Sequence, residues 1–247
     1  MTTLFISDLH LEADRPDITD QFLAFLDGEA RAADALYILG DLFDAWIGDD
    51  DPAEHVRRII DALRALVDGG TPGFFMHGNR DFLIGARFAQ ESGFTLLDDP
   101  TVLTLYGERV VLMHGDTLCT DDTEYQAFRR MVRDPAWQAK MLALPVAQRR
   151  ALAAQARSAS STALAGKPDA ITDVNADAVG AAFVSAGTAL LLHGHTHRPA
   201  VHELTVDGRV CTRIVLGPWY EQGSVVRWDE AGYALCELPR AAAGAPL

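Results

Sequence analysis

Short apolar runs alternate with amphipathic segments through the N-terminal part of the chain. The runs have the character of buried strands, and the segments between them carry apolar residues at helical spacing. The expected strands are 4–7, 35–39 and 73–76, and the expected helices are 21–26, 52–67 and 82–90. This alternation predicts parallel strands joined by helices, with functional groups beyond the carboxyl ends of the strands.

A helical stretch interrupts this pattern in the second half of the chain. Short strands occupy 95–114, with a hairpin turn at Tyr106-Gly107-Glu108, and helical segments rich in Ala then follow Asp116. The expected helices are 124–132, 135–144, 146–164 and 174–183. We interpret this stretch as a helical cap inserted between two strands.

The strand pattern returns after the helices. The expected strands are 189–192, 201–206, 210–216, 224–227 and 233–237. The last four are predicted to form an antiparallel meander, with turns at Asp207-Gly208 and Ala231-Gly232. The sequence therefore divides into a core of 1–117 and 187–240, a helical cap of 118–186, and a disordered tail of 241–247.

Charge is distributed unevenly along the chain. The 247 residues carry a net charge of −14, which argues against nucleic acid as a partner. Basic residues nevertheless cluster in the expected cap, at Arg129, Arg130, Arg133, Lys140, Arg149, Arg150, Arg157 and Lys167. We expect this basic segment to lie where an anion binds; the alternative is a solvated helix face that balances acidic neighbours.

Features of cellular location are few. Three cysteines without C-x-x-C spacing suggest reduced thiols in a cytosolic setting. Asp8 and His10 interrupt the first apolar run, so no signal peptide is expected, and no stretch reaches the roughly 18 apolar residues that span a bilayer. The sequence indicates a cytoplasmic protein and no protein partner.

Five polar blocks follow expected strands and contain seven potential metal ligands. The blocks are Asp8-Leu9-His10, Gly40-Asp41, Gly78-Asn79, His114-Gly115-Asp116 and Gly194-His195-Thr196-His197. Two carboxylates, one amide and four imidazoles are enough to hold two divalent metal ions, a type of site that mostly hydrolyses phosphate esters and anhydrides. Mixed oxygen and nitrogen ligands favour Mn²⁺, Fe²⁺, Zn²⁺ or Co²⁺ over Ca²⁺ or Mg²⁺.

Local spacing adds detail to this metal site. On a regular strand Asp8 and His10 would point to the same face. Asp41 follows Gly40 at a tight bend, and each of its carboxylate oxygens can take one cation. Asp44, Asp81 and Asp116 follow the blocks and are candidates for orienting the ligands. The run Asp49-Asp50-Asp51 is expected to be a solvated loop.

The blocks match the pattern D-x-H, G-D-x-x-D, G-N-x-D, H-G-D and G-H-x-H of the calcineurin-like metallophosphoesterases, which the chain resembles outside the cap. The resemblance implies a four-layer α/β/β/α sandwich, here with an inserted helical cap. It also implies one metal held by Asp8, His10, Asp41 and His197, and a second held by Asp41, Asn79, His114 and His195, with Asp41 bridging the two.

The third block departs from the general pattern at Arg80, where the superfamily usually has a histidine that serves as proton donor. Arginine does not act as a general acid near neutral pH, but it binds phosphate through two hydrogen bonds and stabilises developing charge. A nucleoside monophosphate is a good leaving group that does not need a proton donor. Arg80 therefore favours a pyrophosphate substrate over an alkyl phosphomonoester.

Arg80, the cap and the early Ile-Ser-Asp-Leu-His-Leu are similar to one branch, the UDP-2,3-diacylglucosamine diphosphatases. That resemblance implies hydrolysis of a UDP-linked diacyl sugar at the α-phosphate, giving lipid X and UMP in lipid A biosynthesis. It implies Mn²⁺ as the metal and peripheral association with the cytoplasmic side of the inner membrane. Asn79, Arg80 and His195 would serve catalysis. The family's substrate-contacting positions are Asn79, Arg80, Asp122, Ser160, Leu164, Lys167 and His195, with Leu164 where the family commonly has a polar residue.

The cap suits a substrate with a charged head and acyl chains. Arg157 and Lys167 are positioned to meet phosphate. The candidate groove residues are Phe128, Met131, Trp137, Met141, Leu142 and Leu152, together with Trp46, Phe82 and Leu83. For each of these the alternative is ordinary helix packing. The alternative function is a dinuclear-metal nucleotide pyrophosphatase or phosphodiesterase that acts on a soluble substrate; a protein-interaction scaffold fits poorly with seven intact ligands.

Overall fold

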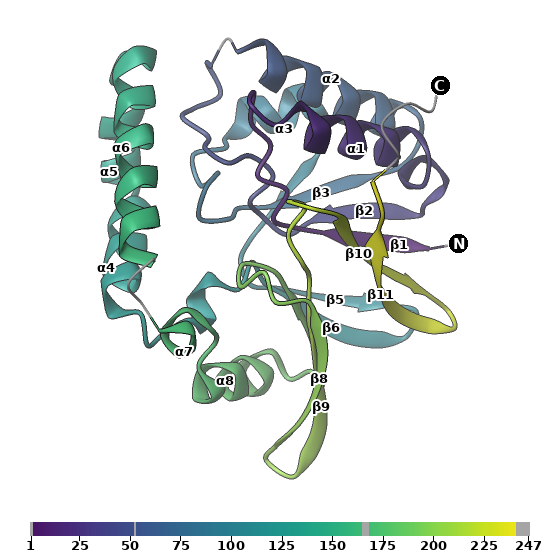
Figure 1. Ribbon diagram of the computed structural model, residues 1–247. Helices are drawn as coiled ribbons and strands as arrows, with labels where there is room; N and C mark the ends of the chain where they lie inside the picture. The colour runs from purple at the N-terminus through teal and green to yellow at the C-terminus, as the bar shows by residue number, and fades with distance from the viewer. Residues whose placement is uncertain (1, 52, 165–167, 241–247) are drawn as a thin grey trace.

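Two β-sheets face each other in the computed structural model, which describes residues 2–51, 53–164 and 168–240, without the side chains of 159–164 and 169–170 (Figure 1). The first sheet has the order β11-β10-β1-β2-β3-β4. Its strands are β1 (Thr3–Ile6), β2 (Ala35–Ile38), β3 (Gly73–Met76), β4 (Thr95–Leu97), β10 (Gly223–Asp229) and β11 (Gly232–Leu238). The strands β1 to β4 are parallel, which confirms the prediction from the alternating pattern.

The second sheet has the order β5-β6-β7-β9-β8. Its strands are β5 (Thr101–Leu105), β6 (Glu108–Leu112), β7 (Leu190–His193), β8 (Ala200–Val206) and β9 (Arg209–Val215). The central strands β6, β7 and β9 are parallel, although the whole insert separates β6 from β7 in sequence. The carboxyl ends of β6 and β7 therefore lie side by side, at one edge of this sheet.

Helices cover the outer faces of both sheets (Figure 1). The helices α1 (Pro16–Asp27), α2 (Glu54–Asp68) and α3 (Ala86–Ser92) pack on the first sheet, and α8 (Ala176–Ala186) packs on the second. In α2 the buried residues Val56, Ile59, Ile60, Leu63 and Leu66 recur at helical spacing, so one face of the helix is apolar. Short 3₁₀ turns lie at Ala30–Ala32 and Asp116–Leu118.

Three hydrophobic clusters correspond to the three contacts between four layers. One lies between α1–α3 and the first sheet, and another joins the two sheets through residues such as Phe5 and Leu192. The third joins the second sheet to α8, where Val179 and Phe183 pack with Val111 and Leu191. The predicted α/β/β/α sandwich is confirmed.

The C-terminal strands do not form the predicted meander. β8 and β9 pair antiparallel in the second sheet, whereas β10 and β11 pair antiparallel in the first, where β10 lies beside β1. The chain thus crosses between the sheets after β9. Alternating apolar residues identify a strand but not its sheet, because either sheet buries the same kind of face.

The helices α4 (Thr123–Val132), α5 (Pro135–Leu142) and α6 (Val146–Leu164) stand beside the sandwich, with the short α7 (Asp169–Thr172) below them (Figure 1). Because α8 contributes to a core cluster, we propose that α8 belongs to the sandwich and that the insert proper consists of the helices before it. The expected tail of 241–247 lies outside the described residues.

We predict that Phe183→Ala lowers the free energy of unfolding by about 3–5 kcal/mol, because its buried ring joins α8 to the second sheet. Urea denaturation measures this loss. The matched control is Val184→Ala on the same helix, whose side chain is 60% exposed, and it should change stability by less than about 0.5 kcal/mol. Equal stabilities of the two variants would show that α8 is not part of the core.

Candidate metal centre

The loops after the parallel strands hold the proposed ligands in strained backbone conformations. Asp8, His10, Asp41, His195 and His197 all have positive φ, between 50° and 67°. Non-glycine residues adopt this region uncommonly, and sparsely populated conformations cluster at functional sites. Five of the seven proposed ligands are thus held in conformations that their surroundings must stabilise.

Asp8 and His10 are not on a regular strand, so the prediction that strand geometry aligns them was wrong. β1 ends at Ile6, and the chain then follows the neighbouring loop: Asp8 N donates to Gly40 O at 3.1 Å and His10 N to Asp41 O at 3.0 Å. These backbone bonds join the first two ligand blocks. The positive φ at both residues, rather than the strand's pleat, turns their side chains toward each other.

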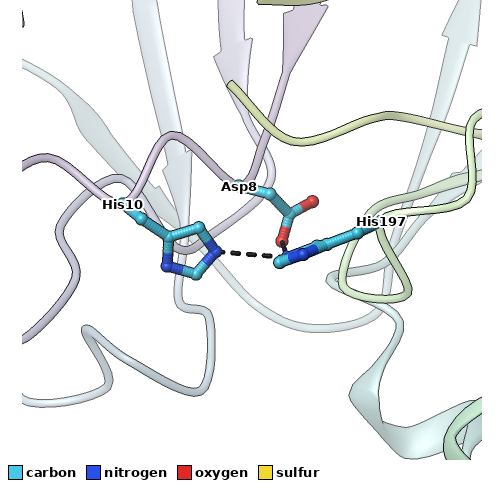
Figure 2. A group of neighbouring side chains, drawn as sticks. All are labelled: Asp8, His10 and His197. Carbon is cyan, nitrogen blue, oxygen red and sulfur yellow. Dashed lines mark hydrogen bonds and ion pairs between the residues drawn. The ribbon is translucent and has the colours of Figure 1, made fainter. Parts of the chain in front are cut away.

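One group of donor atoms comes from Asp8, His10 and His197 (Figure 2). His10 Nε2 lies 3.2 Å from His197 Nε2, and His197 Nε2 lies 3.4 Å from Asp8 Oδ1. His197 comes from the loop after β7, 187 residues after His10 in the sequence. Two imidazole nitrogens and a carboxylate oxygen at such separations can surround one cation.

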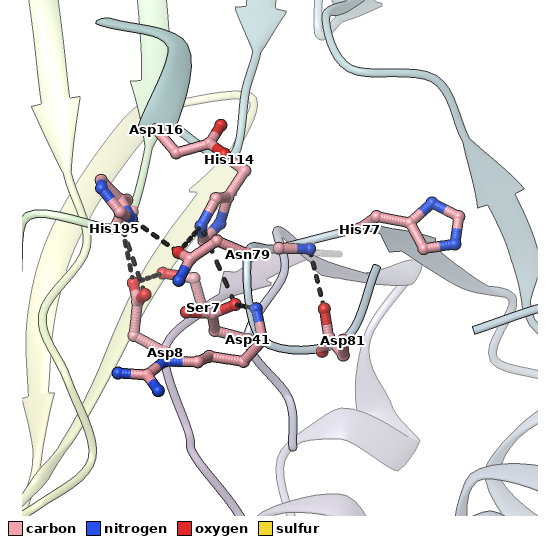
Figure 3. A network of polar contacts seen from close by, with 12 residues as sticks. Ser7, Asp8, Asp41, His77, Asn79, Asp81, His114, Asp116 and His195 are labelled. Atoms are coloured by element: carbon pink, nitrogen blue, oxygen red, sulfur yellow. Dashed lines mark hydrogen bonds and ion pairs between the residues drawn. The ribbon is translucent and has the colours of Figure 1, made fainter. Parts of the chain in front are cut away.

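A second group comes from Asp41, Asn79, His114 and His195 (Figure 3). Asn79 Oδ1 lies 2.8 Å from His195 Nδ1 and 3.0 Å from His114 Nε2. His114 Nδ1 lies 2.9 Å from the carbonyl oxygen of Leu39, to which it donates when Nε2 carries the lone pair. That tautomer leaves Nε2 available to a metal.

Asp41 faces both groups. Its Oδ2 lies 3.8 Å from His10 Nε2, and its Oδ1 lies 3.9 Å from His114 Nε2. The side chain is buried, and Oδ1 also accepts a hydrogen bond from Arg80 N at 2.8 Å. This arrangement supports a carboxylate that bridges two cations.

Buried polar groups fix the loops around the ligands. Asp81 Oδ1 accepts from Gly78 N, and Asp81 Oδ2 accepts from Leu42 N, each at 2.8 Å (Figure 3). Asp81 therefore connects the second and third ligand blocks. Ser7 Oγ donates to Asp8 Oδ2 at 2.5 Å, and the same carboxylate accepts from His195 N. A Cβ at Gly194 would lie 2.2 Å from Ser7 Oγ, so the close approach of these two loops requires glycine.

The electrostatics of the centre favour bound cations. Burial lowers the pKa of His10 to about 3 and that of His195 to about 4, so both are neutral near pH 7. Burial, together with the charges of Asp81 and Asp8, raises the pKa of Asp41 to about 7. Burial lowers the pKa of His114, but Asp41 and Asp116 raise it to about 9. A cation favours ionised Asp41 and neutral His114, the states that ligation requires.

A cavity of about 400 Å³ opens beside the centre, between the loops after β2 and β3 and the helices α4–α6. Asn79 and Arg80 contribute to its wall near the ligands. The apolar wall contains Trp46, Ile47, Phe82, Leu83, Phe128, Trp137, Met141 and Leu152. Of the candidate groove residues, Met131 and Leu142 are not part of this wall; they are 47% and 42% exposed.

Besides Asn79 and Arg80, two of the predicted substrate-contacting residues lie in the cavity wall. Asp122 and Arg157 line the cavity, and Arg157 Nη2 pairs with Asp44 Oδ2 at 2.6 Å. Ser160 and Leu164 lie on α6, and their side chains are not among those that the structure describes. Lys167 is outside the described residues.

Arginines of the basic segment attach the insert to the rest of the chain. Arg129, Arg133, Arg149, Arg150 and Arg157 bind carboxylates or backbone carbonyls of the sandwich and its loops. Four of the five pair with carboxylates, as the alternative of balancing acidic neighbours describes, whereas Arg133 binds the carbonyl oxygens of His77 and Gly78. The insert is attached to an acidic core largely through arginine side chains.

The run Asp49-Asp50-Asp51 is a loop with Asp50 exposed, as expected, but all three carboxylates have partners within the chain. Asp49 accepts from Gly85 N, Arg87 N and Phe88 N at the start of α3, and from Trp46 Nε1 at 3.1 Å. Asp50 and Asp51 pair with arginines of α6. A charge run in sequence gives no sign of partners that fold back from elsewhere in the chain.

Two tyrosines beside the ligands were not identified from the sequence. Tyr125 stacks on His195, with ring centroids 5.7 Å apart, and its hydroxyl donates to Asp116 Oδ2 at 2.7 Å. Tyr220 stacks on His10 at 5.4 Å. Neither residue is part of a ligand block. Tyr125, one turn after the helix-capping Asp122, carried the only available signal: an aromatic residue at the start of the insert.

The chain is similar to known proteins over nearly its whole length. Residues 1–199 match the profile of the calcineurin-like phosphoesterase family. The chain is 56% identical over 242 residues to a UDP-2,3-diacylglucosamine hydrolase of Xanthomonas oryzae pv. oryzae, covering 95% of this chain and 98% of that protein. Over 247 residues it is 53% identical to the protein of the same name from Stenotrophomonas maltophilia, covering 97% and 100%. A solved archaeal phosphodiesterase aligns with a TM-score of 0.47 and 14% identity, over 96% of this chain and 100% of that one.

We predict that Asp41→Ala abolishes binding of both metal ions, because the two oxygens of Asp41 face both ligand groups. The measurement is metal content per chain after equilibration with Mn²⁺ and gel filtration. Asp61→Ala, at an exposed carboxylate on α2, is the control and should keep the wild-type content. Retention of one tightly bound ion by Asp41→Ala would show that Asp41 does not bridge.

Proposed function

This chain belongs to the calcineurin-like phosphoesterase family, and we propose that it hydrolyses the pyrophosphate bond of UDP-2,3-diacylglucosamine. Attack of water at the α-phosphate gives 2,3-diacylglucosamine 1-phosphate (lipid X) and UMP, a step of lipid A biosynthesis. The observation that carries this proposal is the largely apolar cavity that opens directly beside the two groups of metal-ligating side chains.

The donor set fits two divalent cations, one held by Asp8, His10, Asp41 and His197 and the other by Asp41, Asn79, His114 and His195. When bound, such a pair supplies an activated water and neutralises charge on phosphate oxygens. We propose Mn²⁺, because imidazole nitrogens mixed with hard oxygens suit it well. The chain's own residues hold these positions through the strained loops.

Arg80 gives the phosphate end of the cavity a permanent positive charge. Its backbone nitrogen is fixed by Asp41 Oδ1, and its side chain lines the cavity. A guanidinium there binds the phosphate that carries the developing charge, and it does not have to release a proton. Attack at the α-phosphorus expels the phosphate of the diacyl sugar, a leaving group that needs no proton donor, whereas an alkoxide leaving group needs one.

Asn79 and His195 meet at the boundary between the metal centre and the substrate. Asn79 contributes both to the second ligand group and to the cavity wall, and its Oδ1 contacts His195. Substrate phosphate bound at Arg80 is therefore next to both residues. We assign them a double role, in which they hold the metal and position the α-phosphate.

The diacyl part of the substrate explains the apolar walls contributed by the loops and by the insert. A soluble nucleotide needs no cavity lined by Trp46, Phe82, Trp137 and Met141. Within the described ranges no helix combines the length and apolar character that crossing a bilayer requires. We propose peripheral association with the cytoplasmic side of the inner membrane, where exposed Phe128 and Met131 on α4 face the lipid surface.

We predict that the purified protein with Mn²⁺ releases UMP from UDP-2,3-diacylglucosamine. Chromatography of the released nucleotide measures this reaction. In ¹⁸O-labelled water the label should enter UMP, because water attacks the α-phosphorus. Label in the lipid phosphate would contradict the assigned position of attack. Rapid hydrolysis of soluble diesters without UMP release from the lipid would favour the alternative phosphodiesterase function.

We further predict that Arg80→Ala lowers kcat by about 10²–10³-fold while metal content stays at the wild-type level, because the guanidinium acts on phosphate charge and is not a ligand. Arg80→Lys should recover only part of the loss, since an ammonium lacks the planar fork. Steady-state kinetics measures kcat, and metal analysis of the same samples measures the metal content. An unchanged kcat in Arg80→Ala would remove Arg80 from catalysis.

A further inference from the structure

Arg149 is a buried arginine in the first turn of α6, in a chain whose other insert arginines are more exposed. Its side chain is only 3% exposed, and its neighbour Arg150 is 51% exposed. Burying a guanidinium is costly unless its donors are satisfied by well-placed acceptors. The acceptors of Arg149 therefore identify the segments that this side chain holds together.

The guanidinium joins three separate segments. Nε donates to Leu144 O at 2.9 Å, in the connection between α5 and α6. Nη1 donates to Ile47 O at 2.6 Å and to Asp50 Oδ1 at 2.7 Å, and Nη2 donates to Asp50 Oδ2 at 2.5 Å. Ile47 and Asp50 belong to the loop that follows the second ligand block. One side chain thus fixes two helices of the insert to the loop that leads from the metal centre.

The fit between loop and guanidinium is close. Gly48 has a φ of 131°, and a Cβ there would lie 2.3 Å from Arg149 Nη1 and 2.9 Å from Leu142 Cδ2. The loop is also fixed from its other side, because Asp49 binds Trp46 Nε1 and the first turn of α3. Arg149 therefore docks on a rigid surface rather than on a loose loop.

The docking point lies in the wall of the apolar cavity. Arg149 and Ile47 both line it, next to Trp46. Other parts of the wall come from α5 and α6, through Trp137 and Met141 of α5 and Leu152 of α6. In Figure 1 α5 and α6 stand beside the sandwich, so the width of the cavity depends on how they are attached to it.

We propose that Arg149 is a positioning residue for substrate selection: its contacts with Asp50 and Ile47 set the spacing between the insert and the Trp46 loop, and this spacing fits the cavity to long acyl chains. The inference rests on the proposed function, and it adds a residue that touches neither the metals nor the phosphate.

Arg149→Met tests this role, because methionine keeps an unbranched apolar stem and removes every donor. The assay measures kcat/KM in mixed micelles for UDP-2,3-diacylglucosamine with long acyl chains and for a short-acyl analogue of the same UDP sugar. We expect the preference for long chains over short chains to fall by about tenfold or more, the effect of losing a charged hydrogen bond. The loss should appear in KM for the long-chain substrate, with kcat and metal content unchanged.

The neighbouring pair provides a matched control. Arg150 pairs with Asp51 through the same chemistry, but at an exposed position outside the cavity wall. Arg150→Met should keep both the chain-length preference and KM within about twofold, since exposed ion pairs contribute little. An equal fall of preference in the Arg149 and Arg150 variants would overturn the proposal, because it would assign the effect to net charge.

A second variant keeps the test decisive if Arg149→Met folds poorly, as judged by thermal melting. Arg149→Lys retains the charge but cannot contact Ile47 O and both oxygens of Asp50 together, so it should show an intermediate preference. Equal decreases of kcat/KM for both chain lengths in a folded variant would reduce Arg149 to a general structural role. Failure of the proposed function is distinguishable, because wild-type protein would then release no UMP from the long-chain substrate.

Discussion

The position of Asp41 between two groups of ligands is the constraint on which the rest of the structure depends. A buried carboxylate whose oxygens face His10 on one side and His114 on the other requires loops from both sheets to meet at one point. Parallel strands within each sheet place those loops at one edge, and the facing of the two sheets brings the edges together. The positive φ of Asp41 and its buried, mutually repelling carboxylate neighbours cost free energy that the packed layers beneath must offset.

The helices of the insert are attached to a strongly acidic sandwich without a large shared hydrophobic core. Its arginines bind the carboxylates and carbonyl groups of the loops, and Arg129 pairs with buried Asp116 of the fourth ligand block. The guanidinium of Arg133 also lies over the ring of Phe82, 6.0 Å from the ring centroid. The interior between insert and sandwich therefore remains a cavity, with polar attachments around apolar walls.

Features with a local cause were predictable from the sequence. The apolar runs predicted the sandwich, and the polar blocks after them predicted the ligand groups. Both predictions were possible because a strand end and the polar residue after it are neighbours in the chain. The positive φ of Asp8 and His10 was not predictable, since it arises from hydrogen bonds to Gly40 and Asp41. The same holds for the sheet that β10 joins and for the contacts of Asp50 with Arg149. Each depends on segments far apart in sequence, and neither partner alone carries a signal.

Position 80 shows how one framework accommodates different phosphoryl chemistry. The backbone nitrogen of Arg80 is held by the bridging Asp41, and the next residue, Asp81, fixes the loops on either side. The side chain at this position is therefore aimed from a rigid base that does not depend on its identity. A histidine there would supply a proton, whereas arginine supplies a fixed positive charge near Asp41 and Asp44. In a centre with this excess of carboxylates, such a charge lowers the electrostatic cost of bringing in a pyrophosphate, and it restricts the reaction to leaving groups that depart without a proton.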